Sequence, residues 1–289
     1  MDEGGQPAAG RHQHSGTTLA QVSWQQNFYA AMLPAACELQ LSATRKFVYR
    51  LASNPQAAVH AGWLLGLAFQ AEGIVHKMDS CYRAGTRDFI VMGHSQGGAI
   101  AFLLTSHLRS LQAQGLLPAD LRLKTYCSAG PKPGNLYYAY DYERATAGGW
   151  AVNVVNPADW VPEMPLSVQT PNDFSPVNPF VGVNAMIKKQ PFPKNLAARH
   201  LYGQLARPSL RAQRRYQRYL GGYLAKAVGK NVPGYQAPAF YPSSDYVRVG
   251  NTVVLPADSA YYAQYPDDPA KLFQHHLFQP YYYLAQRLP

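Results

Sequence analysis

The feature that most constrains the fold is a glycine-rich turn between two apolar runs. The run DFIVMG, Asp88–Gly93, is short, apolar and bounded by turn residues, which is typical of a strand buried in a parallel sheet. The run AIAFLLTSHLRSLQAQG that follows the turn is typical of a helix, and it ends at Gly115, a common helix terminator. A strand that leads directly into a helix predicts α/β structure.

Further strands are predicted downstream of this unit. The runs LRLKTYCSAG and WAVNVVNPAD are apolar and close in Gly, Pro or Asp, so strands alternate with helices and a mostly parallel sheet with flanking helices is expected. The run DYVRVGNTVVL predicts a β-hairpin that turns at Gly250–Asn251. The last run, AKLFQHHLFQPYYYLAQRL, predicts a helix or a pair of turns interrupted at Pro280. We expect residues 1–289 to form a single domain.

Composition narrows the class of protein. Of the 289 residues 47% are hydrophobic, enough for a sizeable core, but no apolar run approaches the roughly 20 residues of a membrane-spanning helix. The first fourteen residues, MDEGGQPAAGRHQH, lack the apolar stretch of a signal peptide. Cys37, Cys81 and Cys127 are too few and too scattered for a disulfide framework or a zinc site.

The positive charge is concentrated in one segment. The chain carries a net charge of +10, and residues 174–244 hold 11 of its 26 Lys and Arg residues and not one Asp or Glu. This predicts a local surface for an anionic partner. Within it, RRYQRYLGGYLAKAV is expected to form an amphipathic helix weakened at Gly221–Gly222, whose apolar face holds Tyr216, Tyr219, Leu220, Tyr223 and Leu224. The helix is either an interfacial lid or a cap packed on the core. We find no nucleic-acid-binding module.

The glycine-rich turn has the pattern of a nucleophile elbow. Gly93-His94-Ser95-Gln96-Gly97 matches G-x-S-x-G, in which the turn is strained and the residues two before and two after the serine must be small. The helix that follows would direct backbone N–H groups at an oxyanion formed beside Ser95. We therefore predict that Ser95 is a catalytic nucleophile.

A serine nucleophile needs a base, and the base needs a carboxylate to orient it. Asp159 lies at the carboxyl end of a predicted strand, where open α/β sheets place their ligands, and is the expected acid. His275 and His276 lie near the C-terminus, where the last member of such a triad belongs, and position alone does not choose between them. His200 lies in the basic segment and has the surroundings of a solvated helix residue.

From about Ser15 onward the chain resembles the class 3 lipases, the fungal-type triacylglycerol lipases and their bacterial relatives. The resemblance rests on five ordered motifs: VHAGW, GHSQGGAIA, SAGPKPGN, VNPADWVPEMP and HHLFQPYYYLAQ. It implies an α/β-hydrolase fold with a helical cap insertion, at about residues 165–245, and a catalytic triad of Ser95, Asp159 and His276. His276 is favoured as the base because Tyr281 follows it at the family's spacing.

A weaker match concerns the oxyanion hole. The stretch SGTTLAQVSWQQNF is similar to the family's Arg-Gly-Thr loop, which implies that Thr17 assists the backbone N–H of Gln96. In the family this loop follows a buried strand, whereas only fourteen polar residues precede Ser15 here. We therefore expect an N-terminally truncated chain in which an inner strand is missing, the edge of Asp88–Gly93 is open, the protein aggregates and activity is low.

These observations predict a serine carboxylic-ester hydrolase, in first place a triacylglycerol lipase. A phospholipase A1 and a short-chain esterase are the alternatives within the enzyme class, and a non-catalytic binding module on a hydrolase scaffold is the alternative outside it. No metal or organic cofactor is expected. The expected partners are a lipid or ester substrate and, through the segment 174–244 placed over or beside the Ser95 pocket, anionic lipid interfaces. A secreted or periplasmic location is expected if a signal peptide was lost with the N-terminus, and a cytoplasmic one otherwise.

Overall fold

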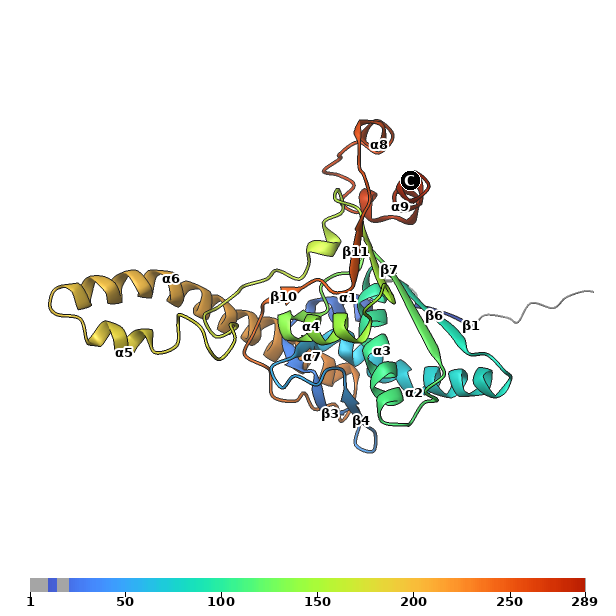
Figure 1. The fold of residues 1–289 in the computed structure, drawn as a ribbon, viewed down its shortest axis with the longest axis horizontal. Coiled ribbons are helices and arrows are strands. Elements are labelled where there is room, and N and C mark those ends of the chain that lie inside the picture. The colour runs from blue at the N-terminus through green and yellow to red at the C-terminus, as the bar shows by residue number, and fades with distance from the viewer. Residues whose placement is uncertain (1–9, 15–20, 289) are drawn as a thin grey trace, which may run out of the picture.

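A parallel sheet lies at the centre of the molecule (Figure 1). The structure, a computed structural model, describes residues 10–14 and 21–288. Within these residues five strands pair side by side, all in parallel, in the order β1-β6-β7-β9-β11. Their bounds are Gly10–His14, Asp88–His94, Arg122–Ser128, Ala151–Val155 and Asn251–Val254. This confirms the predicted α/β class and the mostly parallel sheet.

Helices cover the sheet and enclose the main core. α3 (Gln96–Ala113) packs against β6, β7 and α2 (Ala61–Arg83), and α4 (Leu136–Ala145) and α1 (Gln21–Phe28) lie beside them. Most of the apolar residues of α2 and α3 are buried, with Phe69 as an exposed exception, as expected for helices that pack between a sheet and a second layer. No helix in the described part of the chain is long and apolar enough to cross a membrane.

Two smaller antiparallel sheets flank the parallel one, and they correct one prediction. One has the order β10-β8-β5-β2, with bounds Tyr246–Val247, Gly134–Asn135, Ala58–His60 and Met32–Pro34; the other pairs β3 (Ala36–Gln40) with β4 (Lys46–Arg50). The hairpin predicted at Gly250–Asn251 is wrong, because β10 pairs with β8 and β11 pairs with β9 in the other sheet. Gly250, at φ +81°, turns the chain from one sheet into the next.

The predicted open edge beside Asp88–Gly93 is also wrong. β1 lies parallel to β6, with Gly10 opposite Phe89 and His14 opposite Gly93, and β7 lies on the other side of β6. The sequence GRHQH has no apolar alternation, and therefore it was not predicted as a strand. Strand pairing, however, uses backbone N–H and C=O groups, which polar residues supply equally well. Because β1 pairs with β6, the reasons for expecting a missing inner strand and aggregation through an open edge no longer apply.

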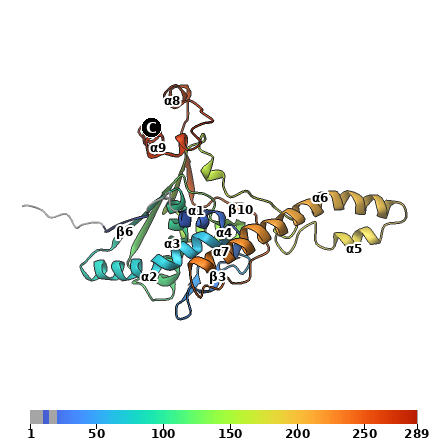
Figure 2. The same cartoon turned by 180° about the vertical axis from the view of Figure 1, so that it is seen from behind.

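A helical arm extends from the body (Figures 1 and 2). It contains α5 (Val183–Lys188) and most of α6 (Lys194–Gln217), and α6 continues through the π-helical turn η2 (Arg218–Tyr223) into α7 (Leu224–Asn231). The body contacts η2 closely: the Ala31 N–H donates to the Leu220 carbonyl at 3.1 Å, and a Cβ at Gly221 would lie 2.7 Å from that of Ala31. A glycine is therefore required there.

The wider π turn changes which residues share a face. Tyr219 and Tyr223 were predicted to belong to the buried apolar face, but both are exposed and their rings stack on each other, with centroids 5.6 Å apart. Tyr216 is half-buried with Leu220 and Leu224. The cap interpretation therefore holds for η2 and α7, which pack on the body, and the remainder of the segment is the arm.

The C-terminal residues form a unit above the sheet (Figure 1). It contains α8 (Ser259–Gln264), a 3-10 turn η3 (Gln274–His276) and α9 (Phe278–Ala285). Elsewhere in the chain, a second 3-10 turn, η1 (Val161–Glu163), follows β9. Pro280 does not interrupt a helix as expected, because it lies in the first turn of α9, where a missing N–H is tolerated. A small separate apolar cluster holds the unit together: Ala129, Leu255, Tyr261, Tyr281 and Leu284.

Candidate active site

Ser95 lies on a strained turn between β6 and α3. Its backbone has φ 60° and ψ −131°, a conformation that L-residues rarely adopt. Gly93 is required beside it, because a Cβ there would lie 2.2 Å from the carbonyl oxygen of Gly97. The Ser95 N–H donates to the carbonyl of Ser128 at the end of β7, at 3.0 Å. The turn therefore presents the Ser95 side chain at the carboxyl edge of the sheet.

A chain of hydrogen bonds leads from Ser95 into the protein. The Ser95 Oγ lies 2.7 Å from His276 Nε2, and His276 Nδ1 lies 2.8 Å from Asp159 Oδ2. The Asp159 side chain is fully buried and that of His276 is 11% exposed. The structure thus brings together three residues that the sequence predicted from three separate segments, and their catalytic roles remain predictions.

Asp159 is held by further donors. The Tyr281 hydroxyl donates to Asp159 Oδ2 at 2.8 Å, and the Val161 N–H donates to Asp159 Oδ1 at 3.0 Å. Burial, together with the charge of Asp159, raises the pKa of Tyr281 far above its usual range, so the hydroxyl stays protonated and continues to donate. The same hydroxyl accepts from the N–H of Asn156 at 3.2 Å. Both carboxylate oxygens are thereby fixed in position.

His275, the reserve base, is bound elsewhere. Its Nδ1 lies 2.7 Å from the Tyr261 hydroxyl and its Nε2 lies 3.0 Å from Asp267 Oδ1. Burial is the main cause that raises the pKa of Tyr261 to about 12. The amide of Asn156 donates to Tyr261 and to the His275 carbonyl. His275 therefore anchors the turn η3, and only its neighbour reaches Ser95.

His94 holds the turn η3 in place through a hydrogen bond, a role that the sequence did not indicate. Its Nε2 lies 2.9 Å from the carbonyl oxygen of His276, so it must carry a proton to donate, and its Nδ1 then accepts from Ser128 Oγ at 2.9 Å. Burial, and secondarily the charge of His276, lowers the pKa of His94, which favours this neutral form. His94, the residue before Ser95, thus fixes the backbone of His276.

An apolar cavity of about 500 Å³ opens at Ser95. Aromatic and aliphatic side chains form most of its wall: Trp24, Phe28, Trp63, Trp160, Val161, Met164, Phe273, Leu277 and Phe278. Phe273, Leu277 and Phe278 lie close to His276 in the sequence, and Trp160 and Val161 directly follow Asp159. Apolar neighbours of the predicted acid and base were the signal that could have found these wall residues. No residue of segment 174–244 lines this cavity, so the segment does not lie over it; α7, within the segment, contacts α1, which supplies part of the cavity wall.

The structure describes one of the two predicted oxyanion donors, Gln96. Gln96 is the first residue of α3, immediately after Ser95, and its side-chain amide donates to Gln26 Oε1 at 3.1 Å. Thr17 lies outside the described residues. Within those residues no cluster of three or more His, Cys, Asp or Glu side chains could hold a metal ion.

The sequence was compared with family models and with known proteins. Residues 16–169, more than half of the chain, match the family model described as "Lipase (class 3)". A comparison with curated proteins found no match.

Solved fungal lipases are similar to part of the chain. Lipase II from Rhizopus niveus is 29% identical (TM-score 0.31), with 38% of this chain and 40% of that chain covered. The lipase from Rhizopus microsporus var. chinensis is 28% identical (TM-score 0.33), with 38% and 37% covered. The Rhizomucor miehei triacylglyceride lipase is 26% identical (TM-score 0.32), with 38% and 40% covered. The chain thus spans about two fifths of the length of the solved lipases that it matches.

The family assignment rests on the family model, which spans the elbow and Asp159 in one continuous match. The parallel sheet, the strained serine between β6 and α3, and the acid after β9 are arranged as the α/β-hydrolase fold requires. The chain belongs to the class 3 lipase family.

Proposed function

We propose that the protein is a serine carboxylic-ester hydrolase that cleaves acyl esters of lipids, with triacylglycerol as the preferred class. One observation carries the proposal: the unbroken hydrogen-bonded chain from Ser95 Oγ through His276 to the buried Asp159. Membership of a lipase family supports the same activity. A non-catalytic binding module would leave this strained and buried arrangement without a purpose.

The geometry accounts for each step of acyl transfer. Ser95 Oγ attacks the ester carbonyl carbon while His276 Nε2 takes the hydroxyl proton, and Asp159 stabilises the imidazolium and fixes its tautomer. The tetrahedral oxyanion accepts from the Gln96 N–H at the start of α3 and, by family resemblance, from Thr17. His276 then passes its proton to the leaving alcohol. Water hydrolyses the acyl-enzyme by the same steps in reverse order.

The cavity at Ser95 supports a fatty acyl substrate. It is lined mainly by apolar side chains, and its volume of about 500 Å³ is ordinary for a small-molecule site. Burying an acyl chain against Trp160, Phe273 and Phe278 releases apolar surface from water, at roughly 25 cal/mol per Å². This favours a lipase over a short-chain esterase, whose substrates would leave most of that wall unused. Triacylglycerol and a phospholipid share the acyl group, so a direct comparison must separate them.

The mechanism is tested by fluorophosphonate labelling and ester turnover. The wild type should label at Ser95, and Ser95→Ala should not. His276→Ala should lose turnover by about 10⁶-fold and Asp159→Ala by about 10⁴-fold, and combining them should add little, because the three act as one unit. His275→Ala is the matched control and should retain labelling, since its imidazole contacts Tyr261 and Asp267 instead of Ser95. Turnover by Ser95→Ala, or absence of wild-type labelling, would disprove the proposal.

The substrate class is tested with a series of p-nitrophenyl esters and with two lipids. We expect kcat/KM to rise from acetate to octanoate, since the longer chain fills more of the cavity. Trioctanoylglycerol emulsions should be hydrolysed faster than phosphatidylcholine vesicles of the same acyl chain. A preference for the phospholipid would reassign the protein as a phospholipase A1, and a preference for acetate would reassign it as a short-chain esterase.

A further inference from the structure

The arm, defined here as residues 174–212, has a surface unlike the rest of the molecule. It carries six basic residues, Lys188, Lys189, Lys194, Arg199, Arg207 and Arg211, and no Asp or Glu. All six are exposed. None of the ion pairs found in the described part of the chain involves any of them. The arm is therefore a cationic projection with no internal counter-charge.

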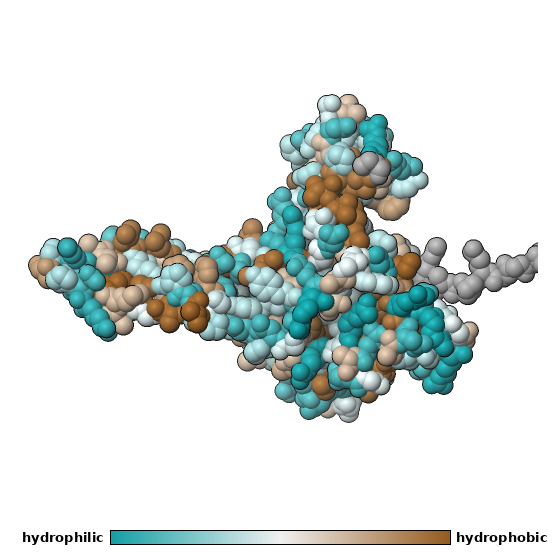
Figure 3. Space-filling view, in the orientation of Figure 1, coloured by the Kyte–Doolittle hydropathy of each residue, from teal (hydrophilic) through white to brown (hydrophobic). Residues whose placement is uncertain are grey.

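The arm also exposes large apolar side chains (Figure 3). They occur in the loop before α5, in α5, at the tip and along α6: Phe174, Val177, Phe180, Val181, Met186, Phe192, Leu196, Leu201 and Leu205. Phe192 is 77% exposed and Leu205 70%. Exposed apolar surface of this extent is uncommon on a soluble monomer and marks an interaction surface.

The tip of the arm combines both properties. The connection between α5 and α6 holds Phe192 within a few residues of Lys188, Lys189 and Lys194. An aromatic ring flanked by lysines is suited to a lipid interface, where the ring enters the headgroup–acyl boundary and the ammonium groups reach phosphates. The tip is also the part of the arm farthest from the body (Figure 1).

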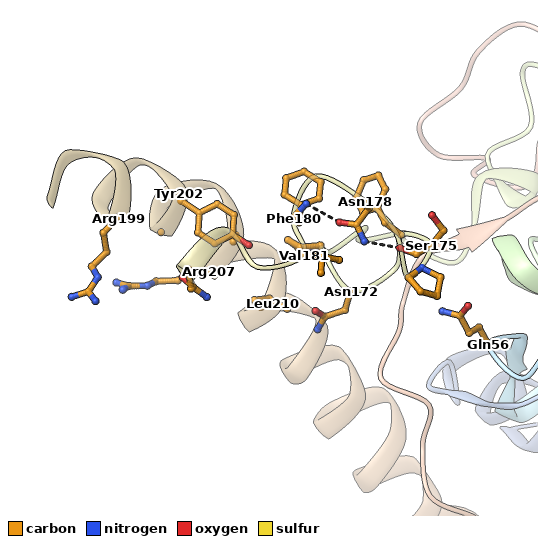
Figure 4. Close-up of a pocket in the computed structure, with 16 residues that line it drawn as sticks. Gln56, Asn172, Ser175, Asn178, Phe180, Val181, Arg199, Tyr202, Arg207 and Leu210 are labelled. Atoms are coloured by element: carbon orange, nitrogen blue, oxygen red, sulfur yellow. Dashed lines mark hydrogen bonds between the residues drawn. The ribbon is translucent and has the colours of Figure 1, made fainter. Parts of the chain in front are cut away.

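A second cationic feature lies between α6 and the loop before α5 (Figure 4). A hollow of about 790 Å³ opens there, with Arg199 near one end and Gln56 at the other. Arg207 folds back along α6 over Gly203, where a Cβ would lie 3.3 Å from its guanidinium carbon. The absence of a side chain at Gly203 thus allows the guanidinium to lie one turn closer to Arg199. Two guanidinium groups in one open hollow suit a phosphate.

The distribution of the apolar residues indicates the kind of partner. Leu196 and Leu205 are nine residues apart on α6, which is two and a half helical turns, so they lie on opposite sides of the helix and both are exposed. A protein partner covers one face, and lysine is depleted at protein interfaces. A second copy of the chain would place one set of cations against another. A lipid bilayer contacts the arm at its surface, where it supplies both phosphates and an apolar phase.

We infer that the arm docks on an anionic lipid bilayer, with Phe192 at the headgroup–acyl boundary and the lysines and arginines on lipid phosphates. The arm lines no part of the cavity at Ser95, so it acts as a tether and not as a lid. The inference does not depend on hydrolysis, and it is therefore testable with lipids that have no ester bond.

The experiment is sedimentation of the full chain with vesicles of dialkyl-ether phosphatidylcholine, either alone or with one third dialkyl-ether phosphatidylglycerol. The chain should bind the anionic vesicles at least tenfold more tightly than the neutral ones, and high salt should abolish the difference. Replacing Lys188, Lys189 and Lys194 by Gln should weaken binding by about fivefold per lysine. Phe192→Ser should weaken it further, and Arg199→Gln with Arg207→Gln should lower only the anionic component.

Matched controls change one exposed lysine and one exposed apolar residue outside the arm. Lys77→Gln on α2 and Leu116→Ser after α3 should leave vesicle binding unchanged. Equal binding to neutral and anionic vesicles, or a lysine variant that binds like the wild type, would overturn the inference. So would a concentration-dependent dimer in light scattering that Phe192→Ser dissociates. Hydrolysis of a soluble p-nitrophenyl ester should be the same in all arm variants, which separates this result from the proposed activity.

Discussion

At the scale of single residues, two glycines show that the space around a residue determines whether it can be replaced by alanine. A Cβ at Gly93 would lie 2.2 Å from the backbone of Gly97, which cannot move without opening the elbow, whereas a Cβ at Gly73 on α2 would meet nothing within 4 Å. Gly93→Ala should cost about 3 kcal/mol or more and abolish fluorophosphonate labelling. Gly73→Ala should raise the free energy of unfolding by about 0.5–1 kcal/mol. Urea unfolding of both variants checks this, and similar effects would contradict it.

Tyr281 offers a second test at this scale, because its hydroxyl binds the candidate acid while the rest of its ring is packed in the small C-terminal core. Tyr281→Phe removes a charge-assisted hydrogen bond, so kcat should fall by roughly 10- to 100-fold with little change in KM. Tyr282→Phe is the control, since Tyr282 is exposed and its ring stacks on that of Phe278. Steady-state kinetics on a soluble ester would measure both. A change in KM alone would indicate a role in binding instead of positioning.

At the scale of elements, α2 and α3 each carry a buried histidine outside the candidate site. His60 caps α2, where its Nδ1 accepts from the Trp63 N–H, and burial lowers its pKa to about 3. His107 lies on α3 against Phe47, its Nδ1 has no partner in the described part of the chain, and burial lowers its pKa to about 4. Both imidazoles are therefore neutral in the folded protein over the whole range in which free histidine titrates.

Lowered histidine pKa values make the fold sensitive to acid. As the pH falls below 6.5, the unfolded chain binds protons at these positions and the folded chain does not, so the free energy of unfolding falls. Each histidine should contribute up to about 1.4 kcal/mol per pH unit, until His107 titrates in the folded state near pH 4. His107→Phe should remove the contribution of one proton, about 1.4 kcal/mol per pH unit, from the dependence of the unfolding free energy on pH. Urea unfolding between pH 7 and pH 4.5 measures it, and an unchanged slope would disprove the assignment.

The elements that the sequence predicted are those determined by local pattern. β6, α3, β7 and β9 follow from apolar runs and turn residues, and the elbow follows from the space around Gly93. What failed depended on partners distant in sequence. β10 and β11 have hairpin composition but join different sheets, and β1 is a strand only because β6 offers it an edge. The role of His94 could not be predicted either, since its partner is 182 residues away.

At the scale of the whole molecule, the candidate site spans two cores. Ser95 is supported by the main core through α3, whereas His276 belongs to the C-terminal unit, which has its own small cluster. Regions with few buried contacts open at lower cost than the whole fold. His276 should therefore separate from Ser95 before the sheet unfolds.

Leu284→Ala tests this division. Leu284 is fully buried in the small cluster, so the substitution should destabilise the C-terminal unit by about 2–5 kcal/mol. Labelling at Ser95 should then be lost at a lower urea concentration than the far-ultraviolet circular dichroism. The matched control, Leu103→Ala in the main core, should shift both transitions together. Coincident transitions in Leu284→Ala would show that the molecule unfolds as one unit.

The separation of Ser95 from His276 also has a consequence for the time at which the chain becomes reactive. The two residues are 181 positions apart, and His276 and Asp159 are 117 apart, whereas the elbow itself is formed by neighbours. Contacts that close such long loops form late in folding. During synthesis, Ser95 emerges long before His276 does. A ribosome-bound chain would thus carry a shaped serine without its proposed base, and the proposed ester hydrolysis would begin only once the segment that carries His276 is in place.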